Sequence, residues 1–484
     1  MPLNMLSTKR IGKKVGFFRF KKLNDGYLLT NETGEYVFLN PEDFESFVFE
    51  KPGLKNIERY NDLVERGFIK TEDKNDLLIQ KYLRRNSFFN EGVTLHIVVI
   101  TLRCNNSCTY CQSSAGLPND KSLDMSLETA KDVVDKIFQT PNPSFTIEFQ
   151  GGEPLINFDI VKFIITYSKE KNITANKKIN FSLVTNLALL TDEKFDFLMK
   201  QEVSLCTSLD GPRLLHNKNR IALNNKHDSY ADVLRGIKKI RSCQKKSGFN
   251  TKLNALLTVT KDSLKYPREI VDEYVKLGFD KIFLRHLNTF VFPAKIKSKL
   301  QYSAEDFLVF YKKAMDYIIA LNKRGVIFQE CTAYILLVKI LKGADPNFMD
   351  LRSPCGAVIG QLAYNFNGDV YTCDEGRMFG RKGDDTFKLG NVRDNCFLDF
   401  LNSPIAKTMC VASCLDNLPG CADCVYKPYC GVCPLMKYAE NGNIFGSCRG
   451  DMRCAIFSGI LDYLFEKIQD QNCLKIFQNW INLP

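Results

Sequence analysis

Short apolar runs alternate with longer amphipathic segments from residue 95 to residue 285. The short runs fit buried strands, and the longer segments repeat apolar residues at helical spacing. We expect strands at Leu95–Thr101, Phe145–Phe149, Ile179–Thr185, Val203–Ser208, Leu253–Thr260 and Lys281–Arg285, with helices at Leu127–Gln139, Phe158–Lys169, Thr191–Lys200, Tyr230–Lys245 and Pro267–Leu277. Right-handed crossovers would curl such a parallel sheet, so the pattern predicts an α/β fold with a partial (β/α)6 barrel of the TIM type.

The pattern differs on both sides of this region. Residues 17–39 read as strands, and helices are expected at Pro41–Glu50, with Asn40 as its cap, and at Tyr60–Arg66. Strands followed by short helices suggest a winged-helix-like module. After an expected helical stretch, Ala304–Lys342, the chain becomes rich in cysteine and turns. The predicted domains are therefore 1–88, 89–343 and 344–484.

Composition narrows the classes of protein. The 484 residues are 45% hydrophobic and 25% charged, which suits two or three domains with sizeable cores. No apolar run has signal-peptide length near the N-terminus or approaches the ~20 residues of a membrane span, so we expect a cytoplasmic protein without a membrane partner. Reduced cytosolic thiols make metal binding a better reading of the 18 cysteines than disulfides. The net charge of +11 is scattered; it fits a solvated surface or an acidic peptide, and we expect no nucleic-acid partner.

Three cysteines follow the first expected strand directly. Cys104, Cys108 and Cys111 have the spacing Cys-x3-Cys-x2-Cys. Three thiolates on one loop can hold a cubane iron–sulfur cluster and leave one iron without a protein ligand. That iron can chelate the amino and carboxylate groups of S-adenosylmethionine (SAM). The alternatives are buried thiols or a zinc site, although a closed zinc site needs a fourth ligand and no other Cys or His lies near this loop.

The loop, with Tyr110 before its last cysteine, resembles the signature of the radical SAM superfamily. This resemblance implies a 4Fe-4S cluster and SAM as cofactors. Further strand ends resemble SAM-contacting segments of that family and imply cofactor-binding roles for Gly151, Gly152, Glu153, Pro154, Asn186, Ser208 and Arg220. A plain turn is the alternative at the glycines, and Arg285 on the last strand could equally form a structural ion pair.

A second cysteine pattern resembles the SPASM domain of radical SAM maturases, which carries two auxiliary 4Fe-4S clusters. The resemblance assigns the distal cluster to Cys421, Cys424, Cys430 and Cys448, and the proximal cluster to Cys355, Cys373 and Cys433. Two features depart from the family pattern: two residues instead of three separate the last cysteine pair, and no second cysteine follows Cys355 closely. The proximal cluster could then keep an open iron or recruit Cys331, Cys396, Cys410 or Cys414. A zinc-ribbon-like site is the alternative for Cys421–Cys433, and Cys206, Cys243, Cys454 and Cys473 read as buried apolar residues.

Asp374 follows Cys373 directly. An aspartate at this place acts as a base on the substrate in sulfatase-maturing relatives, which implies the catalytic role of a base for Asp374. A turn-capping aspartate is the alternative.

Over nearly the whole chain the sequence resembles the His-Xaa-Ser system radical SAM maturases, for example in Leu95–Cys104, Phe149–Leu155 and Leu418–Cys424. The resemblance implies a ribosomally made precursor peptide with His-Xaa-Ser repeats as substrate, a reductant such as flavodoxin or ferredoxin, and a second radical SAM protein as partner. Residues 1–88 would then capture a leader peptide as an added strand, or serve only as a packing domain. Open alternatives are a small-molecule substrate, a protein side chain as in sulfatase maturation, and a non-catalytic iron–sulfur protein.

Overall fold

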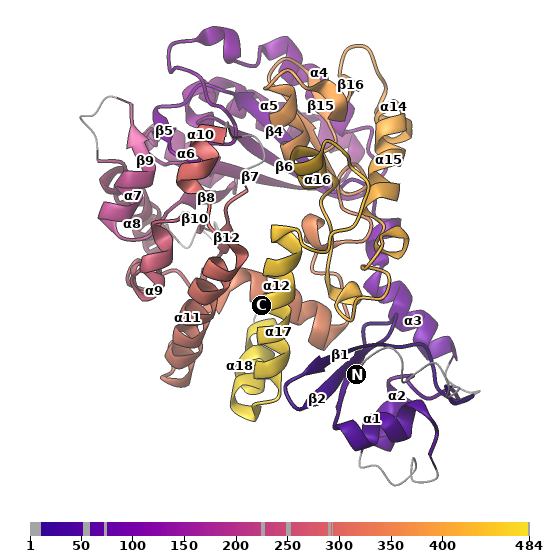
Figure 1. Cartoon of the computed structure of the whole chain (residues 1–484). Coiled ribbons are helices and arrows are strands. Elements are labelled where there is room, and N and C mark those ends of the chain that lie inside the picture. The colour runs from indigo at the N-terminus through magenta and orange to yellow at the C-terminus, as the bar shows by residue number, and fades with distance from the viewer. Residues whose placement is uncertain are drawn as a thin grey trace.

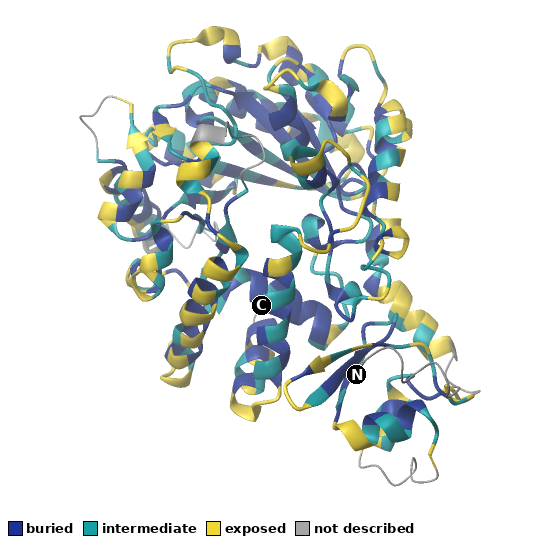
Figure 2. Ribbon diagram, in the orientation of Figure 1, coloured by how far each residue is buried: buried dark blue, intermediate teal, exposed yellow. Residues whose placement is uncertain are grey.

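A central sheet organises the computed structural model, which describes residues 11–51, 59–71, 75–223, 228–247, 253–288, 292 and 294–482. Within these ranges the largest sheet has nine strands in the order β12-β10-β8-β7-β6-β4-β14-β15-β16. Helices surround it, and the N-terminal module lies at one end of the molecule beside the C-terminal helices (Figure 1). Buried residues concentrate on the sheet and on the facing sides of the helices (Figure 2).

Six parallel strands form the partial barrel that the sequence predicts. They are β4 (Leu95–Thr101), β6 (Ser144–Gly151), β7 (Lys178–Thr185), β8 (Ser204–Ser208), β10 (Leu253–Val259) and β12 (Leu284–His286). The helices between them are α4 (Leu127–Ile137), α5 (Phe158–Ala175), α6 (Asp192–Lys200), α7 (Arg213–Asn219), α8 (Ser229–Ser247) and α9 (Pro267–Lys276). The fold prediction is confirmed, with one difference. The expected strand Lys281–Arg285 is split, because β11 (Lys281–Ile282) pairs instead with β13 (Gln329–Glu330).

Alternation along β6 shows how the sequence positions a polar interior. Phe145, Ile147 and Phe149 are buried in the hydrophobic core, whereas Glu148 and Gln150, on the opposite face of the strand, line a cavity. Successive side chains of a strand point to opposite faces, so an apolar-polar repeat of period two gives one packed face and one polar face. The polar face is the one that becomes the site.

The cysteine-rich region continues the barrel sheet. β14 (Gln361–Tyr364) pairs in parallel with β4, and β15 (Asp369–Tyr371) and β16 (Lys388–Asn391) follow antiparallel. The Asn-Gly-Asp turn at Asn367–Asp369 joins β14 to β15, with Gly368 at φ 88°. The helices of this region are α13 (Asp374–Gly380), α14 (Phe397–Asn402), α15 (Pro404–Ser413) and α16 (Pro434–Asn441).

The expected helical stretch Ala304–Lys342 consists of α11 (Ala304–Lys323), α12 (Cys331–Leu337) and a π-helical turn at Val338–Lys342. α10 (Ala294–Leu300) precedes it. The C-terminal helices α17 (Met452–Ile468) and α18 (Gln471–Asn482) pack against α11 and α12. None of the described helices has the length and apolar character needed to span a membrane.

The N-terminal module has its own core. β1 (Arg19–Leu23), β2 (Gly26–Thr30) and β3 (Tyr36–Leu39) form an antiparallel sheet, followed by α1 (Pro41–Val48), α2 (Tyr60–Glu65) and α3 (Asn75–Arg85). Asn40 caps α1 as expected. The module contacts the cysteine-rich region, because Thr30 Oγ1 donates to the Val425 carbonyl at 2.7 Å and Tyr429 Oη donates to the Gly34 carbonyl at 2.9 Å.

Candidate active site

A cavity of about 730 Å³ opens at the C-terminal ends of the barrel strands. Its walls come from the three-cysteine loop, the barrel strands and the cysteine-rich region. Of the predicted site residues, those that line it are Cys104, Cys108, Cys111, Gly151, Gly152, Asn186, Ser208, Arg220 and Asp374. The structure thus gathers residues that are up to 270 positions apart in the chain, counting from Cys104 to Asp374.

The three-cysteine loop is fixed by a short antiparallel pairing. β5 (Asn106–Cys108) pairs with β9 (Arg220–Ala222), so that Cys108 lies opposite Arg220. The Thr109 N–H adds a bond to the Asn219 carbonyl at 2.8 Å. On the other side of Cys104, Arg103 forms an ion pair with Asp124 at 2.5 Å. The loop that carries the thiols is therefore held at both ends.

The chemistry of the loop fits an iron–sulfur cluster. Burial raises the pKa of Cys104 to about 12 and that of Cys108 to about 11, so these thiols ionise only when a cation takes the place of their protons. Cys104, Cys108 and Cys111 form no disulfide. Among the described residues, no three His, Cys, Asp or Glu side chains converge as a site for a single metal ion.

Gly151 and Gly152 permit a close approach of two backbones. A Cβ on Gly151 would lie 2.0 Å from the Thr101 carbonyl oxygen, and one on Gly152 would lie 2.2 Å from the Arg103 carbonyl oxygen. The Gly152 N–H donates to the Thr101 carbonyl at 2.9 Å. A side chain at either glycine would push β6 away from the residues that lead into Cys104.

Glu153 and Pro154 are not among the residues that line the cavity. The Glu153 carboxylate is 1% exposed and accepts hydrogen bonds from Thr185 Oγ1 at 2.7 Å and from the Asn186 N–H at 2.8 Å. It therefore ties the end of β6 to the end of β7 and orients Asn186, which does line the cavity. The predicted direct contacts of Glu153 and Pro154 with SAM stay predictions.

Arg220 is part of a buried charged group beneath the loop. Its Nε lies 3.3 Å from Asp210 Oδ1, and Tyr110 Oη donates to Asp210 Oδ2 at 2.5 Å. Its Nη1 lies 3.9 Å from Cys108 Sγ. Burial opposes the charge, but Asp210 raises the pKa of Arg220 overall. Sequence reasoning assigned no role to Asp210, which joins the loop, through Tyr110, to the end of β8.

Two carboxylates of the cysteine-rich region line the same cavity as the cysteine loop. Asp374 accepts from Arg377 Nε at 2.8 Å, and Glu375 lies 3.8 Å from Arg285. Arg285 therefore forms the structural ion pair that was one expectation for it. Arg285 also lines the cavity. Burial, reinforced by Asp350 and Asp374, raises the pKa of Glu375 to about 6. Sequence reasoning gave no role to Glu375 or Glu148. The alternation of apolar and polar residues along β6 nevertheless places Glu148 on the face that lines the cavity.

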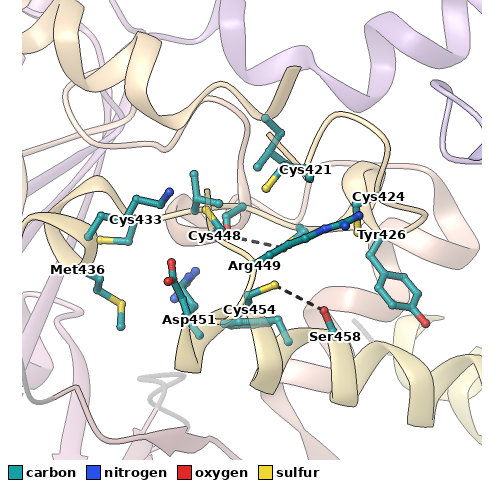
Figure 3. Close-up of a pocket in the computed structure, with 18 of the residues that line it drawn as sticks. Cys421, Cys424, Tyr426, Cys433, Met436, Cys448, Arg449, Asp451, Cys454 and Ser458 are labelled. Carbon is teal, nitrogen blue, oxygen red and sulfur yellow. Dashed lines mark hydrogen bonds between the residues drawn. The ribbon is translucent and has the colours of Figure 1, made fainter. Parts of the chain in front are cut away.

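The C-terminal cysteines surround a second, smaller cavity of about 220 Å³ (Figure 3). Its lining includes the four predicted distal ligands, together with Cys433 and Cys454: the cysteines are Cys421, Cys424, Cys430, Cys433, Cys448 and Cys454. Cys355 and Cys373 lie outside it, in a buried cluster to which Cys433 also packs. The two sets therefore occupy neighbouring places as the sequence pattern divides them, and Cys433 borders both.

Cys454 was expected to be an isolated apolar residue, and instead it lies on α17 at the second cavity. Its Sγ is 3.9 Å from Ser458 Oγ (Figure 3). Among the alternative proximal ligands, Cys331 lines the large cavity and Cys396 is exposed.

Buried cations near the second cavity fit an anionic occupant. Lys339 and Lys437 are 6% and 3% exposed, and they donate to the carbonyls of Leu351 and Gly446. Neither has a carboxylate within 4.0 Å in the described part of the chain, and burial lowers the pKa of Lys339 to about 7. A buried cation without a counter-ion is costly. A cluster held by thiolates is negatively charged, so the charges and the donor set both suit it.

The comparisons with known proteins agree on the fold. Residues 98–274 match the family model described as the radical SAM superfamily. The cysteine-type anaerobic sulfatase-maturating enzyme of Clostridium novyi (strain NT) is 24% identical over 367 residues, covering 73% of this chain and 92% of the relative. The radical SAM cyclopropyl synthase TigE of Paramaledivibacter caminithermalis is 24% identical over 469 residues, covering 92% of this chain and 88% of the relative.

Two solved structures are also similar. Native anSMEcpe with bound AdoMet has a TM-score of 0.67 at 20% identity, covering 80% of this chain and 99% of that chain. Streptococcus suis SuiB bound to precursor peptide SuiA has a TM-score of 0.54 at 14% identity, covering 92% and 100%. These likenesses show the fold, and the matched family model covers the three-cysteine loop and the barrel strands from β6 to β10, which line part of the large cavity. The protein is therefore an enzyme that contains a radical SAM domain over residues 98–274, and its relatives include maturases.

Proposed function

We propose that the protein cleaves SAM reductively to a 5′-deoxyadenosyl radical and uses it to take a hydrogen atom from a ribosomally made peptide, which installs a post-translational modification. One observation carries the proposal. A single cavity of about 730 Å³ is lined both by the three cysteines and by Asp374 and Glu375. Ligand pockets of about 300–1,000 Å³ enclose drug-sized molecules, so SAM and one substrate side chain fit together.

The chain's own residues hold and orient the reactants in this proposal. A 4Fe-4S cluster on Cys104, Cys108 and Cys111 supplies, when bound, the electron that splits SAM. The backbone at Gly151 and Gly152 and the polar groups of Asn186, Ser208 and Arg220 hold the methionine half of SAM, and Glu153 orients Asn186.

Asp374 takes a proton from the substrate, and the buried Arg377 keeps its carboxylate aimed along one wall of the cavity. Residues of the cysteine-rich region thus face the radical source directly. A carboxylate in reach of the reacting position can act as a general base.

The N-terminal module supports a peptide substrate. α3 exposes Leu77, Ile79, Tyr82 and Leu83, which are 44%, 56%, 47% and 58% exposed. In the same module, β1 and β3 are the edges of the three-stranded sheet and pair with no further strand among the described residues. An extended leader peptide could add to such an edge and cover the apolar side chains. The proposed partners are a precursor peptide with His-Xaa-Ser repeats, a flavodoxin or ferredoxin, and a second radical SAM protein.

We also propose two auxiliary 4Fe-4S clusters. Cys421, Cys424, Cys430 and Cys448 would hold the distal one, while Cys355, Cys373 and Cys433 would hold the proximal one. The cysteine-lined cavity and the buried cations Lys339 and Lys437 support this assignment. The relation to sulfatase-maturating enzymes and the position of Asp374 favour a second candidate function, which is modification of a protein side chain without a leader.

The test is an anaerobic assay of protein reconstituted with iron and sulfide, given SAM, a strong reductant and candidate peptides. We expect 5′-deoxyadenosine and a peptide product with changed mass. Ile79→Asp and Leu83→Asp should abolish peptide modification and leave peptide-independent SAM cleavage intact, because both side chains lie on the exposed face of α3.

Ile173→Asp is the matched control, since Ile173 is 82% exposed on α5. Full peptide modification by both α3 variants would refute leader capture and favour the leaderless candidate. Absence of 5′-deoxyadenosine from the reconstituted wild type would refute the radical mechanism.

A further inference from the structure

Arg453 stands between the two cavities. It lies in the first turn of α17 and lines the smaller cavity, while its Nη2 donates to the Asp350 carbonyl at 2.8 Å. Asp350 lines the larger cavity. The loop Cys430–Cys433 packs on the same segment, because a Cβ on Gly431 would lie 2.6 Å from the Asp350 carbonyl oxygen. The guanidinium therefore sits where the two predicted auxiliary sites meet.

The charge of Arg453 is not neutralised within the protein. No carboxylate lies within 4.0 Å of it among the described residues, whereas Arg220, Arg352 and Arg377 each have an aspartate partner. Its Nε is buried and has no hydrogen-bond partner in the described chain. The guanidinium lies over the Phe457 ring, 4.6 Å from the centroid. An unpaired, partly desolvated cation of this kind acts strongly on any anion beside it.

The positive charge of Arg453 lies close to cysteines of both predicted sets. Arg453 lines the smaller cavity together with Cys430 and Cys433. Cys433 also packs in the buried cluster that contains Cys355 and Cys373. Cys430 belongs to the distal set, while Cys355 and Cys433 belong to the proximal set. One side chain thus acts electrostatically on both sites.

We propose that Arg453 sets the reduction potentials of both auxiliary iron–sulfur clusters together. This inference rests on the proposed function, which supplies the clusters. Each one-electron reduction adds one negative charge and breaks no bond, with the electron coming from the reductant. A fixed positive charge stabilises the reduced form more than the oxidised form, and hence raises the potential. Arg453 is a positioning residue in this account, and it makes both clusters better electron acceptors.

The test uses full-length protein with Cys104, Cys108 and Cys111 all changed to Ala, so that signals from the SAM site are absent. Iron and sulfide contents are measured first. Each cluster is then titrated with dithionite and redox mediators and followed by electron paramagnetic resonance. The variants are Arg453→Gln, which removes the charge but keeps a donor, and Arg453→Lys, which keeps the charge. Arg449→Gln is the matched control, because Arg449 lines the same cavity but is exposed.

We expect Arg453→Gln to lower both midpoint potentials, Arg453→Lys to keep them near those of the parent, and Arg449→Gln to shift them less because water screens an exposed charge. Unchanged potentials in a fully loaded Arg453→Gln protein would overturn the inference. If Arg453→Gln fails to retain iron while Arg453→Lys retains it, the charge requirement is supported; loss of iron from both overturns the electrostatic account. Absence of iron and sulfide from the parent would instead refute the auxiliary clusters themselves.

Discussion

The two cysteine regions of this enzyme are built differently. The N-proximal set comes from one loop, Cys104–Cys111, pinned by β9 and open to a cavity of about 730 Å³. The distal C-terminal set, Cys421, Cys424, Cys430 and Cys448, is gathered from several elements around a cavity of about 220 Å³. The cation beside the first set, Arg220, is paired with Asp210, whereas Lys339, Lys437 and Arg453 beside the second donate to backbone carbonyls and have no carboxylate within 4.0 Å among the described residues.

These differences are those expected if the first region is a reaction site and the second, as proposed, holds clusters that carry electrons. A loop with an internally neutralised cation and a large cavity leaves room and charge balance for a bound small molecule. An enclosed cysteine cage with unpaired cations is suited to a permanent anionic group. The shared strand pair β4–β14 keeps the two regions in one rigid unit.

The largest expected effect is a difference in activity between variants of the two cysteine sets. Cys104→Ala should reduce 5′-deoxyadenosine formation to background, because it removes a ligand of the radical source. Cys421→Ala should leave SAM cleavage measurable and remove the modified peptide. Chromatography of 5′-deoxyadenosine and mass spectrometry of the peptide report the two outcomes. Cys473→Ala, in buried α18, is the control. Equal loss of SAM cleavage in Cys104→Ala and Cys421→Ala would contradict the assignment of different roles to the two cysteine sets.

Loss of the internal counter-charge is the next largest effect. Asp210→Asn should destabilise the protein by about 3–5 kcal/mol, since it leaves the buried Arg220 charge unpaired. Asp192→Asn removes an ion pair with Lys239 in which the Asp192 side chain is 93% exposed, and should cost at most about 1 kcal/mol. Urea unfolding under anaerobic conditions measures both. Similar costs in the two variants would show that Arg220 does not depend on Asp210.

Backbone proximity at the loop gives a smaller effect. Gly152→Ala places a Cβ 2.2 Å from the Arg103 carbonyl oxygen, and should weaken SAM binding by about 1–3 kcal/mol through displacement of the loop. Gly116→Ala on the same loop meets only the flexible end of Leu123, so it serves as the control. Equilibrium dialysis with labelled SAM gives the affinities. Wild-type affinity in Gly152→Ala would contradict the close packing of β6 on the loop.

The smallest expected effect tests the contact between β4 and β14, where the two regions meet. His96 on β4 lies 3.2 Å from Tyr364 Oη on β14, and burial, with Lys177, lowers its pKa to about 3. The unfolded chain binds a proton near pH 6.5 and the native chain does not, so stability falls as pH drops below about 6.5 toward 3, by up to about 1.4 kcal/mol per pH unit. Urea unfolding of His96→Gln from pH 6.5 to 5 should show a shallower slope by that amount. A slope equal to that of the wild type would show that His96 is not held neutral.

Local signals made much of the barrel predictable. Strand β4 has the predicted bounds, Asn40 caps α1, and the cysteine loop lies at a strand end, because period-two alternation, capping residues and short spacings act over a few residues. The split of the last strand into β11 and β12 was missed, since it depends on pairing with β13, which lies far along the chain.

The missed features of the site are also long-range. No local pattern predicts that β14 pairs with β4 or that Cys454 lines the same cavity as Cys421. Nor does one predict that Glu153 accepts a hydrogen bond from Thr185. The unpaired cations around the second cavity were equally invisible, because pairing is a property of the folded chain. Each of these depends on contacts between distant segments, which composition and spacing do not encode.

The most direct test of the account is electron paramagnetic resonance of the reduced, anaerobically purified wild-type protein with and without SAM. We predict that one cluster signal changes when SAM is added, and that this SAM-sensitive signal is lost in Cys104→Ala while other cluster signals persist. A wild-type protein with only zinc in the Cys104–Cys111 loop and no SAM-dependent signal would contradict it.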